Sequence, residues 1–157
     1  MIEKEELKTI IPHKGKMMLL SRIIDYNTDE KYIRAEFDIT EDCIFFDPVA
    51  GGVPVWAGFE FIAQAISAFT GLRGREKGEK PNPGFILSIP SMYINHPVYK
   101  PGSTVEIRIK ERDYTDVIYT FDGETFLEGK KTMEGKIMVM EIDVNDDRFK
   151  DFLSNFV

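Results

Sequence analysis

Residues 55–72 are apolar almost all the way round when they are drawn as a helix. The strongly polar side chains in this stretch are Glu60, Gln64, Ser67 and Thr70. Three of them, with Gly71, are spaced four, three and four residues apart, which places them in one narrow stripe. A helix at a protein surface has a broad polar face. The pattern therefore predicts a buried helix whose stripe faces a cavity, a partner or other polar groups.

Alternating or apolar runs on both sides of this helix predict strands. The predicted strands cover residues 17–26, 31–39, 84–95, 103–112, 115–121 and 130–143. Asp122-Gly123 is a typical hairpin dipeptide, so it predicts the turn between the last two strands. Short helices are predicted at residues 3–10 and in the tail from residue 146, where three Phe residues recur at helical spacing.

The order strand, strand, helix and four strands indicates an α+β fold with an antiparallel sheet. One long apolar helix must be covered on most sides, so we expect the sheet to wrap around it. The 157 residues are enough for one domain, 1–157, with a full core and no stabilising metal or disulfide. Such a sheet leaves an edge strand that a dimer would cover.

The net charge of the chain limits the classes of partner that it is expected to bind. The formal net charge of −7 argues against nucleic acid or an anionic membrane, which both need a basic surface. Cys43 is the single cysteine, and the charged N-terminus does not have the pattern of a signal peptide, so a cytoplasmic location is expected. An acidic partner would need a local basic patch, for which the candidates are Arg73, Arg75, Lys77 and Lys80. The alternative is that this basic run is a solvated loop.

Glu60 is the strongest chemical candidate. A carboxylate in the first turns of a buried helix costs several kcal/mol to desolvate unless it is paired or hydrogen-bonded. Such a group suits general acid–base chemistry. The alternative is a structural carboxylate that accepts hydrogen bonds from the helix start, where the helix dipole favours it.

Residues 45–69 resemble the active-site segment of the hotdog-fold 3-hydroxyacyl-acyl carrier protein dehydratases. The matching residues are Phe45-Phe46, Pro54-Val55, Gly58, Glu60 and Ala63-Gln64. Ile11-Pro12-His13-Lys14 and residues 17–23 resemble the family's first strand, and residues 85–89 and 97–102 resemble its strand after the helix and the turn behind it. Within the family, the start of the helix is most similar to the dehydratase-like subgroup of aryl polyene and related synthesis systems. The resemblance implies a hotdog fold and a dehydratase.

The chain departs from the family at two positions. Without a gap, Val49 stands where the family has its catalytic His, and Ala63 stands where it has the acid. A gap of three residues restores Glu60 to the acid position, but no gap restores the His. The chain has two histidines, His13 and His96, and neither lies in this loop.

The resemblance implies roles for several residues. Glu60 is expected to move the proton at C2 of the substrate, and His13 to replace the missing loop His, unless it only ties down the N-terminal segment. The backbone N–H of Gly58 is a candidate oxyanion donor, or Gly58 serves a tight turn at the helix start. Phe46 and Trp56 are expected in the core or along an acyl tunnel, and Gln64 is a further candidate for substrate binding.

Three functions stay open at this point. The first is dehydration of 3-hydroxyacyl thioesters of acyl carrier protein or coenzyme A, by a homodimer or a heterodimer with another hotdog subunit. The second is thioester hydrolysis, because Gly51-Gly52 followed by Glu60 also resembles the hotdog thioesterases. The third is a non-catalytic acyl-binding or partner subunit, since Val49 replaces the usual His. No cofactor and no metal site are expected, since motifs for nucleotides or zinc are missing.

Overall fold

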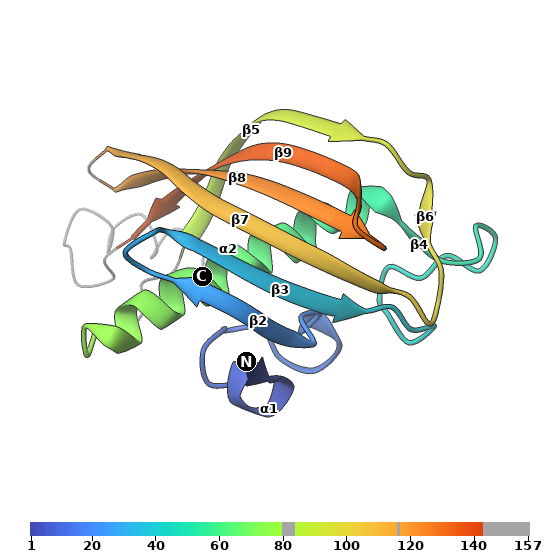
Figure 1. Cartoon of the computed structure of the whole chain (residues 1–157), viewed down its shortest axis with the longest axis horizontal. Coiled ribbons are helices and arrows are strands. Elements are labelled where there is room, and N and C mark those ends of the chain that lie inside the picture. The colour runs from blue at the N-terminus through green and yellow to red at the C-terminus, as the bar shows by residue number, and fades with distance from the viewer. Residues whose placement is uncertain (80–83, 116, 143–157) are drawn as a thin grey trace, which may run out of the picture.

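An antiparallel sheet wrapped around one long helix dominates the structure, a computed structural model that describes residues 1–79, 84–115 and 117–142 (Figure 1). The helices are α1 (Lys4–Leu7) and α2 (Gly58–Glu76), and short 3₁₀ turns cover Gly15–Met17 and Val55–Ala57. The strands are β1 (Ile2–Glu3), β2 (Arg22–Asn27), β3 (Tyr32–Asp38), β4 (Val53–Pro54), β5 (Gly84–Ile94), β6 (Val98–Tyr99), β7 (Thr104–Thr115), β8 (Ile118–Leu127) and β9 (Lys130–Glu141).

Seven of these strands form the main sheet in the order β1-β2-β3-β7-β8-β9-β5, and every pairing is antiparallel. The chain builds one part of the sheet before α2 and the rest after it. Within the described residues, β5 is an edge strand of this sheet and pairs with β9 alone. The short strands β4 and β6 pair with each other beside the start of α2.

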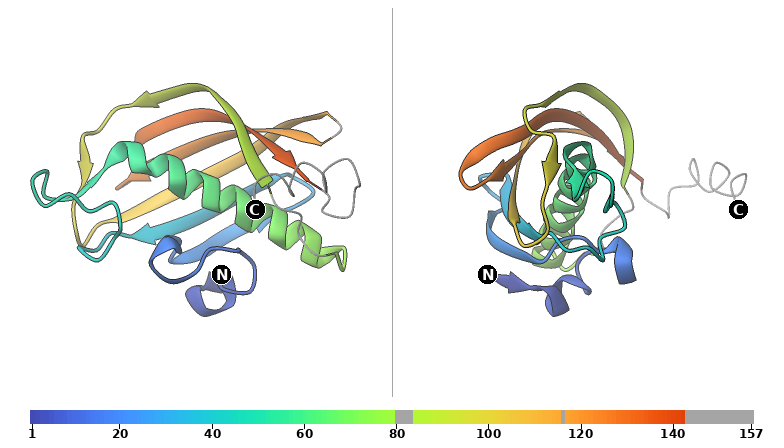
Figure 2. Two further views of the ribbon diagram at one scale, coloured as in Figure 1. Left: turned by 180° about the vertical axis from the view of Figure 1, so that it is seen from behind. Right: turned by 90° about the vertical axis from the view of Figure 1, so that its right-hand side faces the viewer.

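The sheet curls around α2, which lies in its concave face (Figure 2). Phe61 and Phe69 are fully buried and meet Phe37 and Phe121 of the sheet edge to face, with ring centroids 4.8 and 6.3 Å apart. Apolar residues of this kind gain most from leaving water, which explains why the nearly all-apolar helix becomes the core. The predicted α+β hotdog arrangement around one central helix is confirmed.

Gly123 allows α2 to approach the sheet closely. A Cβ atom built at Gly123 would lie 2.4 Å from Cγ2 of Ile62, so no other residue fits there without movement. The predicted hairpin at Asp122-Gly123 is therefore wrong, because both residues lie inside β8 and pair with β7 and β9. The turn between β8 and β9 is Glu128-Gly129, where both residues have positive φ values of 49° and 76°.

Smaller differences concern the ends of elements. The first predicted strand is shorter, because Gly15–Met17 form a 3₁₀ turn and β2 begins at Arg22. α2 extends to Glu76, beyond the predicted end. The predicted helical tail lies outside the described residues, so the single domain over 1–157 stays a prediction.

One helix, counted from Val55 to Glu76, is long and apolar enough to cross a membrane by length and composition. It is the central helix of this fold, and 67% of its most apolar window is buried inside the described structure. Burial by the sheet accounts for its apolar character.

Candidate active site

The sheet leaves one row of α2 side chains only half-buried. This row consists of Glu60, Ala63, Ser67 and Thr70, spaced three, four and three residues apart. Gln64 and Gly71 of the predicted stripe lie on the next row and are buried. A Cβ at Gly71 would lie 2.6 Å from the carbonyl oxygen of Ile10, so this row is covered by the N-terminal segment.

The half-buried row forms the floor of a groove of about 570 Å³. The N-terminal segment forms one wall through residues 9–13, and the other wall comes from β5 and β9. The lining residues from the two strands are Gly84, Ile86, Val139 and Glu141. The lining is mostly apolar, and its ionisable side chains, His13, Glu60 and Glu141, lie at the two ends of the groove.

His13 and Glu60 lie together at the first end of this groove. Nε2 of His13 is 3.7 Å from Oε1 of Glu60, and the two side chains are 27% and 23% exposed. Nδ1 of His13 is buried and has no hydrogen-bond partner within the described residues. The tautomer with its hydrogen on Nε2 therefore directs that N–H toward Glu60 and avoids burying an unpaired N–H.

Gln64 connects Glu60 to the segment that follows His13. Its Nε2 donates to Oε1 of Glu60 at 2.9 Å and to the carbonyl of Met17 at 2.7 Å. Its Oε1 accepts from the N–H of Leu19 at 2.9 Å. The side chain is fully buried and all its groups are used, so it is placed to position Glu60. Direct substrate binding by Gln64 stays a prediction, which this burial does not favour.

Gly58 is buried at the first turn of α2. Its N–H bonds within the preceding turn, to the carbonyls of Val55 and Trp56, so this donor is already used. A Cβ at Gly58 would lie 3.2 Å from Cε of Met133 and 3.4 Å from Cγ2 of Thr125, which explains the glycine by close packing on the sheet. Its role as an oxyanion donor stays a prediction that the geometry does not favour.

Phe46 and Trp56 lie outside the lining of the groove. Phe46 is half-buried against the core, and Trp56 is 56% exposed with its ring edge-to-face on Phe45, at a centroid distance of 5.8 Å. Their predicted contact with an acyl chain stays a prediction. The apolar contact along the groove comes instead from Ile10, Ile11, Ile86 and Val139. These four residues are scattered along the sequence, so no local motif predicts that they line one groove.

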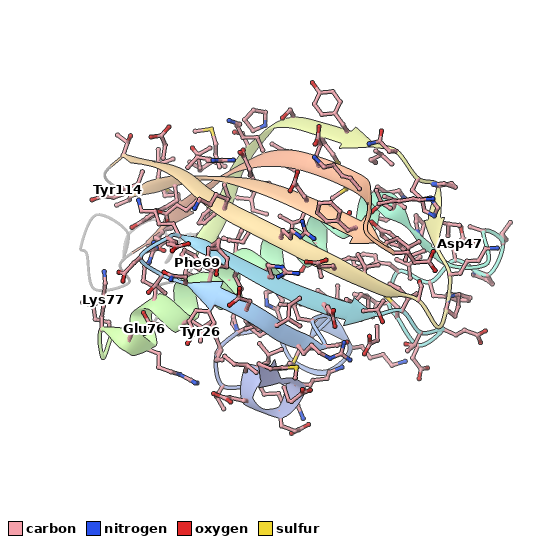
Figure 3. The ribbon with its side chains drawn as sticks, viewed as in Figure 1. Tyr26, Asp47, Phe69, Glu76, Lys77 and Tyr114 are labelled. Atoms are coloured by element: carbon pink, nitrogen blue, oxygen red, sulfur yellow. The ribbon has the colours of Figure 1, made fainter. Side chains whose placement is uncertain are left out.

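Val49 lies at the tip of an exposed loop. Asp47 and Gly52 form an isolated bridge at the base of the loop, and the carboxylate of Asp47 accepts from the N–H groups of Val49 and Ala50. The Val49 side chain is 96% exposed. Figure 3 places Asp47 beyond the first turn of α2, at the opposite end of the molecule from Glu76 and Lys77. The position of the usual catalytic His therefore points out of this chain.

The second histidine is also remote from the groove. His96 stacks beside Tyr99, with ring centroids 6.3 Å apart. The hydroxyl of Tyr99 is buried and shares hydrogen bonds of 2.8 Å with Thr125 and Thr132. Of the two histidines, His13 alone lies beside Glu60.

The other end of the groove borders an ion cluster, of which Glu141 is the member that lines the groove. Arg73 donates to Glu111 at 2.6 Å and to Glu141 at 3.1 Å, and Lys31 lies 3.2 Å from Glu111. Burial raises the pKa of Glu141 above the ordinary value of a carboxyl, and Arg73 opposes this shift. Glu141 lines the groove, and no motif in the sequence predicts this position.

The predicted basic patch is only partly available to an acidic partner. Arg73 is held in the ion cluster, and Arg75 pairs with Glu6 at 3.1 Å and with the hydroxyl of Thr9. Lys80 lies outside the described residues. Among the residues that the structure describes, no three His, Cys, Asp or Glu side chains gather in the way a metal ion requires.

Comparisons with known proteins identify the family of this chain. A family model described as ApeP-like, ApeP dehydratase, matches residues 5–153. The 3-hydroxyacyl-[acyl-carrier-protein] dehydratase FabZ of Campylobacter curvus is 26% identical over 149 residues, which cover 91% of this chain and 99% of that protein.

Two solved structures show how widely the fold is shared. A chain of the dehydratase heterocomplex ApeI:P from Xenorhabdus doucetiae matches with a TM-score of 0.81 and 20% identity, over 93% of this chain and 96% of that one. A hypothetical thioesterase with coenzyme A from Streptococcus pneumoniae TIGR4 matches with a TM-score of 0.61 and 10% identity, over 77% and 84%. At these sequence identities the structural likeness shows the fold alone, and the chemistry has to be argued from the residues of the site.

Replacing Gln64 by Leu tests its positioning role. Gln64→Leu keeps the volume but leaves the Leu19 N–H and the Met17 carbonyl without partners, so we expect the free energy of unfolding to fall by about 1–3 kcal/mol. Urea denaturation measures this loss. Ser67→Ala, on the open row of the same helix, is the matched control and should change stability little. An equal loss in both variants would contradict the special role of Gln64.

Proposed function

We propose that this chain removes water from 3-hydroxyacyl thioesters at the Glu60 end of the groove. The chain belongs to the ApeP-like dehydratase family, whose model matches residues 5–153. The observation that carries this proposal is the 3.7 Å separation of His13 Nε2 and Glu60 Oε1, at the mouth of an apolar groove. Dehydration needs one group to accept a proton and one to donate a proton, close enough to serve adjacent carbon atoms.

The geometry supports an assignment of the two roles. Oε1 of Glu60 already accepts a hydrogen bond from Gln64, which suits a carboxylate that acts as the base. His13 suits the acid as an imidazolium whose Nε2–H faces Glu60, because it returns to the neutral imidazole when it gives up this proton. Glu60 would take the proton from C2, the C2–C3 double bond would form, and the C3–O bond would break as His13 protonates the leaving hydroxyl to give water. The proton then passes from Glu60 to His13, which restores both groups.

The proposed substrate is carried on acyl carrier protein, as for the relatives named after that reaction, or on coenzyme A. The thioester would enter at the end of the groove beside Pro12 and His13, which is open to solvent. A cytoplasmic location is proposed with this role, because the relatives are named as dehydratases of 3-hydroxyacyl-[acyl-carrier-protein].

A second hotdog subunit is the proposed protein partner. β5 exposes apolar side chains along its length, and its outer edge has no neighbouring strand among the described residues. An uncovered apolar edge of this kind favours pairing with another sheet. The heterocomplex ApeI:P supports a partner of the same fold, in a heterodimer or a homodimer.

The Gly51-Gly52 motif, on which the thioesterase alternative rests, has a structural explanation. Gly51 has a φ of 68°, and a Cβ at Gly52 would lie 2.3 Å from the carbonyl oxygen of Tyr99. Both glycines are therefore required by the turn and its packing, without reference to a thioester. Hydrolysis by Glu60 alone remains a reaction that the following two variants separate from dehydration.

Glu60→Gln should lower dehydration of a 3-hydroxyacyl thioester by roughly 100-fold or more, because the amide cannot accept the proton from C2. The hydrogen bond from Gln64 survives in this variant, so we expect little change in stability. Formation of the enoyl thioester is followed by absorbance, and urea denaturation checks the fold. Full activity combined with a loss of stability would show that Glu60 is a structural carboxylate.

His13→Gln should lower the same turnover by about 100-fold, since no other histidine lies at the groove. His96→Gln changes the other histidine of the chain and is the matched control, which should keep wild-type turnover. The assay separates enoyl thioester from free acid. If His13→Gln keeps its turnover and the product is the free acid, the protein is a thioesterase that uses the acid alone.

Charges on β5 should prevent assembly. We expect the double variant Leu87→Lys, Ile89→Lys to sediment as a monomer, because two cations on the exposed edge strand disfavour a second sheet there. Analytical ultracentrifugation compares it with wild-type protein, alone or with a second hotdog subunit. Tyr114→Lys, another exposed residue, is the control and should not alter assembly. A monomeric wild type under both conditions would exclude the proposed interface.

A further inference from the structure

The groove continues well beyond the two proposed catalytic groups. Glu60 and Thr70 are ten residues apart, which is roughly 15 Å along a helix. The floor between them is made of small side chains, Ala63 and Ser67, and the walls are apolar apart from Thr9. A thioester held beside Glu60 and His13 would therefore extend its acyl chain along α2 toward Thr70.

The far end of the groove is polar. Thr70 donates its hydroxyl hydrogen to the carbonyl of Ser67 at 3.1 Å, so its oxygen can still accept a hydrogen bond. Glu141 lines the same end, and its side chain is 19% exposed. Arg73 binds Oε1 of Glu141, which leaves further acceptor positions on this carboxylate.

Glu141 also lines a second cavity, together with Thr70 and Arg73. An alkyl chain that reaches this end of the groove would remove water from the groove side of Glu141 without replacing the hydrogen bonds made there. Burying a polar or charged group without a partner costs more than one methylene gains, since each buried methylene raises affinity only about fourfold. A chain with a hydrogen-bond donor at its terminus would supply the missing bond instead. The two kinds of chain should therefore differ most at the length that just reaches Glu141.

We propose that Glu141 and Thr70 form a terminal subsite that selects acyl chains carrying a hydrogen-bond donor, such as a hydroxyl, at their far end. Plain alkyl chains of the same length bind less tightly there. This inference rests on the proposed function, because it takes the thioester end to lie beside Glu60 and His13.

Two ligand series test the subsite in the purified protein, in the assembly that it forms in solution. The first is a homologous series of straight-chain alkanoyl N-acetylcysteamine thioesters, and the second carries an added terminal hydroxyl. Titration calorimetry should show affinity rising about fourfold for each methylene in the alkyl series and then levelling off. At that length the hydroxylated ligand should bind at least tenfold more tightly than the alkyl ligand.

Three variants test whether Glu141 and Thr70 cause the preference for the hydroxylated ligand. Glu141→Leu should let the alkyl series continue to gain affinity and abolish the preference for the hydroxyl, while Arg73 keeps Glu111 as its partner. Thr70→Val keeps shape and fold and should reduce the preference. Glu111→Gln is the matched control: it changes the other carboxylate on Arg73, which does not line the groove, and should leave both series unchanged.

The outcomes separate this inference from the proposed function. An alkyl series that gains affinity without levelling off, or a preference that survives both Glu141→Leu and Thr70→Val, would overturn the subsite. If short-chain 3-hydroxyacyl thioesters are still dehydrated, the proposed function stands without it. Absence of turnover for every thioester would reject the proposed function, and the binding series would still report on the subsite.

Discussion

The close contact between α2 and the sheet fixes the position of every other feature. At Gly123 the helix approaches the strand so closely that a Cβ would collide with Ile62, and Phe61 and Phe69 pack on Phe37 and Phe121 of the sheet. This contact sets which residues of α2 face the sheet. The row with Glu60, Ala63, Ser67 and Thr70 is turned away from the sheet as a consequence, and the groove forms above it. The packing of α2 on the sheet therefore determines which side chains line the groove.

The proposed catalytic pair depends on two segments that are far apart in the chain, and one amide joins them. Gln64 binds Glu60, Met17 and Leu19 with a single buried side chain. The bond to Leu19 is buried, where an unmade hydrogen bond costs about 1–3 kcal/mol, and the bonds to Met17 and Glu60 are partly buried. The His13 segment is therefore held at a defined distance from Glu60 without any direct strong bond between the two groups.

The sequence predicts the structure best where one periodic pattern decides it. The apolar period of 55–72 predicts the central helix, and Glu60 stands out because a carboxylate in such a helix is unusual, although its catalytic role stays a prediction. The sequence misleads where a residue type serves two purposes. Asp122-Gly123 has the composition of a hairpin, but Gly123 is needed for the approach of Ile62. Gln64 and Ser67 belong to the same predicted stripe, but the N-terminal segment covers Gln64 and leaves Ser67 in the groove. No periodicity of the helix predicts this difference. The basic residues after α2 could not be recognised as paired, because Glu6, Glu111 and Glu141 are distant in sequence.

Ile86 connects assembly with the chemistry of the groove. It lies on β5, the edge that the proposed partner would cover, and it also forms part of the wall of the groove. A second subunit on β5 would therefore exclude water from the same space in which an acyl chain lies. Lower water content strengthens the electrostatic interaction between Glu60 and His13, and it raises the cost of burying Glu141 without a hydrogen-bond donor. Assembly and the choice of acyl chain are then coupled through one strand, even though both proposed catalytic groups belong to a single chain.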